Sequence, residues 1–254
     1  MKVEQCIWTS EGQWGNSNPS LATAQLVFIF IGIDLKNQDQ LLIDLQGHYP
    51  NGHLIFCSTA GEIAGDKILD ESAVCTAIHF EKTQIKIHRQ IITDSADSAL
   101  AGKNIAEALA GEDLKSVFIL SEGTLTNGDF LIQGVNEHLK EKVLITGGLA
   151  GDAGRFTQTF VGVNEVPQPG VIAAVGFYGN NIEIGHGSQG GWTEFGPIRT
   201  VTSSEKNVLY TLDNTNALEL YKRYLGERAE ELPGSALLFP LCIINDDGTQ
   251  LVRT

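Results

Sequence analysis

Short apolar runs rich in β-branched residues alternate with amphipathic segments along most of the chain. The runs at 26–32 and 116–123 are typical of buried strands, and each precedes a segment whose apolar residues lie three or four positions apart. Asn37 and Asn127 stand before these segments, where we expect each to cap a helix. A second apolar run follows each helix. The pattern therefore predicts strand, helix and strand, joined by a right-handed parallel crossover.

Two further strands are predicted in each half of the chain. They cover 73–80 and 84–92 in the first half, and 170–177 and 181–189 in the second. Only a short polar turn separates the two strands of each pair, so we expect them to run antiparallel.

The two halves also resemble each other in sequence. Residues 27–64 align with 117–154 without a gap, and twelve of the 38 aligned positions are identical. This similarity predicts an internally duplicated β-α-β-β-β unit over 26–92 and 116–190. The fold class is then mixed α/β (α+β), with two mixed sheets packed together and the helices outside.

The remaining segments are less regular. An alanine-rich helix is expected at 95–110, between the two copies. After the second copy we expect a strand at 195–204, an amphipathic helix at 216–225 and a strand at 235–244. The final residues LVRT read as the start of a strand whose partner is absent.

Composition and charge exclude several classes of protein. The chain carries 17 basic and 31 acidic side chains, for a net charge of −14, which disfavours binding to nucleic acid. There is no basic and then apolar leader at the N-terminus, and the longest apolar run, 26–33, is too short to cross a bilayer. The four cysteines have no metal-site or redox spacing. These features predict a cytoplasmic protein.

The turns after the second strand of each copy are candidate binding sites. Ligands of open α/β sheets bind beyond the carboxyl ends of the strands. The turn of the first copy offers Ser58 and Thr59, and that of the second offers Gly148, Gly151 and Asp152. Small residues there would let backbone N–H groups approach a ligand. The alternative is that the glycines simply form the turns.

The first strand of the second copy ends in polar residues where the first copy has apolar ones. Glu122, Thr124 and Asn127 follow that strand, against Gly-Ile-Asp at 32–34 in the first copy. This asymmetry favours a single site in the second copy. Ordinary helix capping is the alternative explanation.

His186 and Trp192 lie in a glycine-rich run that could form the rim of such a site. His186 is the candidate ligand for a metal or for haem iron, although a single histidine is more often structural. Signatures of catalysis are absent, since the chain has no GxSxG elbow, no HExxH and no local Cys-His pair.

Several motifs in order carry a resemblance to a known family. They are IFCSTAGEI, ILSEGTLTNGDFLIQGVN, ITGGLAGDAGRFTQTFVG, GVIAAVGF, HGSQGGWTEFGPIRTVT and NALELYKRYLG. Together they resemble the FIST N-terminal sensory domain, which we assign to 1–225. Residues 226–254 resemble the start of a FIST C-terminal domain that the chain does not complete.

The resemblance implies a bacterial signal-transduction sensor that binds a small ligand, an amino acid being one proposal. It also implies a partner such as a histidine kinase or a cyclic-di-GMP enzyme. Some members bind haem and sense nitric oxide, but no haem-ligand motif is available to match here. The competing functions are an enzyme acting on a small metabolite in the same cleft and a scaffold that only forms interactions.

Overall fold

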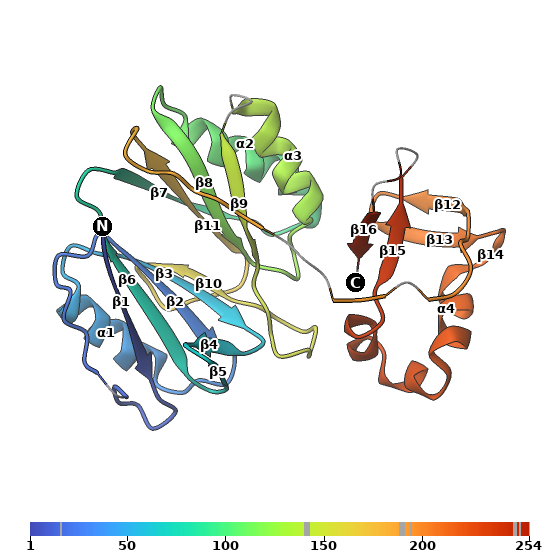
Figure 1. Cartoon of the computed structure of the whole chain (residues 1–254), viewed down its shortest axis with the longest axis horizontal. Coiled ribbons are helices and arrows are strands. Elements are labelled where there is room, and N and C mark those ends of the chain that lie inside the picture. Colours follow the sequence, from blue (N-terminus) through green and yellow to red (C-terminus); the bar gives the residue numbers. More distant parts are fainter. Residues whose placement is uncertain are drawn as a thin grey trace. The chain divides into compact units, whose positions relative to one another are not determined.

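The computed structural model describes residues 1–15, 17–139, 143–187, 191–193, 195–245, 248 and 250–253. The chain divides into two compact units, Met1–His186 and Gly187–Thr254. Unit 1 contains the duplicated region, and its elements are coloured from blue through green to orange-brown in Figure 1.

The strands of unit 1 form two principal sheets and one small hairpin. The five-stranded sheet has the order β1-β6-β2-β3-β10, the four-stranded sheet has the order β7-β11-β8-β9, and β4 pairs with β5. The bounds are β1 Lys2–Trp8, β2 Leu26–Gly32, β3 His53–Thr59, β4 Glu62–Ala64, β5 Lys67–Leu69, β6 Ala73–His79, β7 Gln84–Ile91, β8 Leu114–Ser121, β9 Leu144–Leu149, β10 Val161–Val163 and β11 Val171–Tyr178.

Helices cover the outer faces of the two sheets. They are α1 Gln38–His48 on one side, and α2 Ser98–Leu109 with α3 Gly128–His138 on the other (Figure 1). A short 3-10 turn, Ser95–Asp97, leads into α2, which confirms the expected helix. Three apolar cores result: one under α1, one under α2 and α3, and one between the sheets. The mixed α+β class, with the sheets packed together and the helices outside, is thus as predicted.

The middle core explains why the sheets pack face to face. Leu26 and Ile55 of the first sheet lie in it with Val171 and Val175 of the second. Side chains alternate along a strand, so one face of each sheet supplies this core and the other face packs against helix. The parallel pairs β2–β3 and β8–β9 both run as the crossover prediction requires.

The assignment of strands to copies differs from the prediction. The strand β7, predicted to end the first copy, pairs with β11 in the second sheet, and β10 crosses from the second copy to pair with β3. Four strands then have corresponding orders, β1-β6-β2-β3 and β7-β11-β8-β9. Superposition of the two copies stays a prediction.

The other expectations for unit 1 were confirmed only in part. Of the strand expected at 181–189, residues 181–187 form no strand, although Ile182 and Ile184 pack against the core between the sheets, and 188–189 lie outside the described residues. The strand β1 was not predicted. Asn127 caps α3 by accepting from Phe130 N, whereas Asn37 adopts a left-handed backbone and makes no capping bond with its side chain.

Unit 2 is built from small elements. Its strands form a three-stranded sheet, β12-β13-β14, and a hairpin, β15-β16. The bounds are β12 Val201–Glu205, β13 Val208–Leu212, β14 Thr215–Asn216, α4 Ala217–Leu225, β15 Leu241–Ile244 and β16 Gln250–Arg253, with 3-10 turns at Gly226–Glu231 and Gly234–Leu237.

The structure corrects several predictions in unit 2. The helix at 216–225 is confirmed, with Asn216 as its N-cap. The strand expected at 195–204 begins only at Val201, and that at 235–244 begins as a 3-10 turn. The strand β16 has a partner, β15, so the expectation of an absent partner was wrong. The boundary expected after residue 225 falls inside this unit, and as a boundary between family domains it stays a prediction.

Candidate functional site

The end of β3 joins the two copies through Ser58. This residue is fully buried, and its Oγ donates to Gly151 O at 2.8 Å while accepting from Phe160 N at 2.9 Å. Its backbone also pairs with both residues, since Ser58 N donates to Phe160 O and Gly151 N donates to Ser58 O. Gly151 packs closely here, because an added Cβ would lie 3.1 Å from Ala60 N. Ser58 and Gly151, both predicted as ligand contacts, therefore bind each other.

Thr59 belongs to a second buried network, centred on Glu62. The Thr59 hydroxyl donates to Glu62 Oε1 at 2.6 Å, and the Ser72 hydroxyl donates to Glu62 Oε2 at 2.8 Å. Ser72 N also donates to Oε2, at 3.3 Å. Glu62 is only 1% exposed, and both of its oxygens accept from neutral donors, which suits a carboxylate. Neither Glu62 nor Ser72 was among the ligand contacts predicted from the sequence.

Glu122 is completely buried and holds the loop that follows β8. Its Oε1 accepts from Thr124 N at 2.5 Å, from the Thr124 hydroxyl and from the Thr159 hydroxyl at 2.9 Å. Its Oε2 accepts from Leu125 N at 2.7 Å. Four internal donors thus occupy this carboxylate, and none of them is a cation.

Asn127 has a similar internal role. Its side chain accepts from Phe130 N at 3.1 Å, and its backbone N donates to the Ser98 hydroxyl at 2.9 Å. This is the capping explanation that the sequence left open. Ligand binding by Glu122, Thr124 and Asn127 stays a prediction, but it would have to displace the loop's own hydrogen bonds.

The end of β9 and the turn after it are shaped by Gly147 and Asp152. Gly147 has φ +144°, and an added Cβ would lie 1.8 Å from Ile119 O, whereas Gly148 faces open space. Asp152 is 6% exposed and accepts from the backbone N–H groups of Phe156, Thr157 and Gln158. Burial alone would raise the pKa of this carboxyl, but these hydrogen bonds outweigh it and hold the pKa below its usual value.

Cys57, next to Ser58 at the end of β3, is not prepared for nucleophilic chemistry. Burial raises the pKa of its thiol to about 12. The thiolate is the reactive form, so this cysteine behaves as a buried apolar residue.

His186 and Trp192 are not part of these networks. His186 is exposed at the end of unit 1. Trp192 belongs to unit 2, where its ring is 54% exposed and its Nε1 donates to Leu238 O at 3.3 Å. Their role in ligand or metal binding stays a prediction.

A cleft lies at the edge of the five-stranded sheet, which we call the first sheet, where the parallel strands β2 and β3 have their carboxyl ends. The ends of β1, β2 and β6 meet there, because Ala73 pairs with both Trp8 and Ile31. The β4–β5 hairpin forms one wall at this end (Figure 1). The cavity measures about 470 Å³ and is lined by Ile7, Thr9, Ser10, Gly15, Ala64, Asp66, Lys67, Leu69, Asp70 and Ser72.

The hairpin presents different residues on its two faces. Ala64 pairs with Lys67 across the hairpin, and both line the cleft. Ile63 pairs with Ile68 on the opposite face, where the two residues are 68% and 76% exposed. The sequence signal that could have located this cleft is the charged run at 66–71, which has no counterpart in the second copy.

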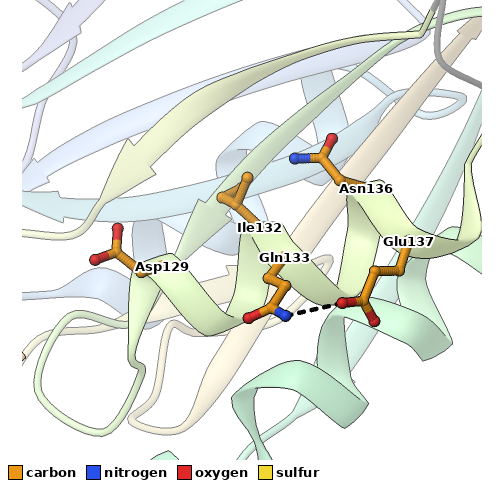
Figure 2. A pocket seen from close by; sticks show the side chains of 5 residues that line it. All are labelled: Asp129, Ile132, Gln133, Asn136 and Glu137. Carbon is orange, nitrogen blue, oxygen red and sulfur yellow. Dashed lines mark hydrogen bonds between the residues drawn. The ribbon is translucent and has the colours of Figure 1, made fainter. Parts of the chain in front are cut away.

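A second hollow, of about 540 Å³, lies on the outer face of α3. Figure 2 shows its five lining residues, Asp129, Ile132, Gln133, Asn136 and Glu137. Gln133 Nε2 donates to Glu137 Oε1 at 2.8 Å within this set. All five come from one helix, so the hollow is less suited than the cleft to enclosing a ligand.

Neither hollow fits haem. Iron in haem is held by histidine, cysteine, methionine or tyrosine, and none of these lines either space. Among the described residues there is also no group of three or more potential metal ligands.

Comparison with known proteins places the chain in a family. No curated protein shows significant similarity to it. No described helix combines the length and the apolar character needed to cross a membrane. The model of the FIST N domain matches residues 25–215, which is most of the chain and covers both parallel strand pairs, the cleft hairpin and the buried turns. The chain belongs to the FIST family, whose N domain is a sensory domain.

Proposed function

We propose that this chain is a signal-transduction sensor whose small ligand binds in the cleft at the carboxyl end of the first sheet. The cleft itself is the observation that carries the proposal. It lies where ligands of α/β sheets bind, and its volume is within the range of small-molecule sites. By contrast, the polar residues at the corresponding end of the second copy form hydrogen bonds within the protein, as Glu122 does with Thr124 and Thr159.

The ligand state would be passed to a partner protein. The family resemblance implies a histidine kinase or a cyclic-di-GMP enzyme of the bacterial cytoplasm as the partner class. The β4–β5 hairpin supports this part of the proposal. One face of it lines the cleft and the other exposes Ile63 and Ile68, so a ligand that orders the hairpin also orders an apolar surface.

A pair of variants on the two faces of this hairpin tests the site. Ala64→Phe fills the cleft, while Ile63→Phe places the same side chain on the opposite, exposed face. A library of small polar metabolites would be screened against both variants and the wild type by ligand-observed NMR. We expect at least one compound to bind the wild type and Ile63→Phe but not Ala64→Phe.

Two outcomes would contradict the proposal. Binding that survives in Ala64→Phe would move the site elsewhere. Chemical conversion of the bound compound, visible in the same spectra, would favour the alternative function, an enzyme acting on a small metabolite. Calorimetric melting of both variants provides the folding control.

A further inference from the structure

We infer that the ligand of the cleft is a small organic cation, an inference that rests on the proposed function. The charges of the lining residues are the first reason. Asp66 and Asp70 contribute two negative charges and Lys67 one positive, so the lining carries 1 − 2 = −1. All three are exposed, and the ion pairs among the described residues include none of them. A monocation would balance this charge, whereas an anion would increase it.

A buried carboxylate behind the cleft wall adds to the negative potential. Ser72 lines the cleft and donates both its N–H and its hydroxyl to Glu62. Because all three of its donors are neutral, the charge of Glu62 is not balanced by a cation. A low-dielectric wall reduces screening, so the field of Glu62 extends toward the cleft.

The remaining lining defines the shape of the cation. Ile7, Ala64 and Leu69 give an apolar surface, and Thr9 and Ser10 contribute hydroxyl groups. A cavity of about 470 Å³ is within the range of small-molecule sites, and only three apolar side chains line it, which suits a ligand with a short aliphatic part. The ligand class is therefore a primary amine with a short aliphatic part.

The whole chain favours the same sign of charge. Its net charge of −14 attracts cations and repels anions at low ionic strength. This long-range term acts on the rate of association. The selectivity between compounds of equal size comes from the cleft itself.

Four probes with the same carbon chain separate the possible ligand classes. They are butylamine, 4-aminobutyrate, butyrate and 1-butanol, titrated against the full chain by ligand-observed NMR at fixed pH and ionic strength. We expect butylamine to bind most tightly and butyrate not to bind. Asp70→Asn should weaken butylamine on the order of tenfold, and Lys67→Met should strengthen it several-fold.

Two control variants separate the outcomes. Asp129→Asn removes a carboxylate from α3, outside the cleft, and should leave butylamine binding unchanged. Ala64→Phe should abolish it. Tighter binding of butyrate or 4-aminobutyrate, lost in Ala64→Phe, would overturn the cation but leave the cleft as the ligand site. Butylamine binding that Ala64→Phe does not affect would overturn both. No response to any probe would overturn the cation class, while the metabolite screen separately decides the proposed function.

Discussion

The chain continues differently beyond the carboxyl ends of the two parallel strand pairs, β2–β3 and β8–β9. After β3 the chain turns back as the β4–β5 hairpin and leaves a cleft beside it. After β9 the chain runs across to the other sheet as β10, and Thr159 on the way donates to Glu122. One end is left open to a ligand, whereas the other is filled by the protein's own side chains.

The buried acids at the two turns illustrate this difference. Glu62 and Asp152 occupy matching positions of the repeat, 90 residues apart. Glu62 binds Ser72 in the cleft wall, whereas Asp152 binds the backbone of its own loop. The same position has thus come to support a cleft in one copy and a closed loop in the other.

Among the substitutions that test this comparison, the largest effect on stability is expected at Gly147. The matching residue of the first copy is Cys57, but an added Cβ at Gly147 would lie 1.8 Å from Ile119 O. Gly147→Ala should lower the free energy of unfolding by about 3 kcal/mol or more, through strain and displaced backbone. Urea unfolding measures this value.

Gly148→Ala is the matched control for that substitution. An added Cβ there meets nothing within 4 Å, so the change should stay within about 0.5 kcal/mol. Similar losses in both variants would show that the close approach at Gly147 is not what shapes the second turn.

A smaller but still large effect is expected at Glu122. Glu122→Ala leaves the partly buried N–H groups of Thr124 and Leu125 without their acceptor, and should cost about 2–3 kcal/mol. Hydrogen exchange should also accelerate at these two amides. If stability is unchanged and only ligand binding is lost, Glu122 is a ligand contact, as the sequence suggested, and the second end is not closed.

Local pattern was enough to predict most elements of unit 1. The helices α2 and α3 and the capping by Asn127 follow from periodicity and from short-range hydrogen bonding. The sheet assignment of β7 and β10 could not be predicted in this way. Each pairs with a strand of the other copy, and the alternation of side chains along a strand does not specify its partner.

The candidate site shows the same limit more sharply. Polar residues after a strand were correctly located in Glu122 and Asp152, but the sequence does not say whether a ligand or the protein supplies their donors. For Glu122 one donor is Thr159, 37 positions away. The cleft depends on how the charged run at 66–71 folds, which is a tertiary property. Its acids could be read from the sequence, but the hollow beside them could not.

The smallest effect is expected at Asp152, where the pH dependence of the free energy of unfolding tests the comparison. The folded state holds the pKa of this carboxyl below its ordinary value of 3.8, because the backbone N–H groups of Phe156, Thr157 and Gln158 favour the ionised form. A group with a lowered folded pKa stabilises the protein in full above the unfolded pKa. That contribution is lost as the pH falls through the folded pKa.

Asp152→Asn should therefore cost about 1 kcal/mol at neutral pH. The difference from the wild type should shrink as the pH falls from about 4 through the folded pKa, below which the wild-type carboxyl is protonated as well. Urea unfolding of both proteins over a series of pH values measures this gap. A gap that stays constant into the acid range would mean that the ionised carboxylate does not hold the loop after β9. The closing of the second end would then rest on Glu122 and Ser58 alone.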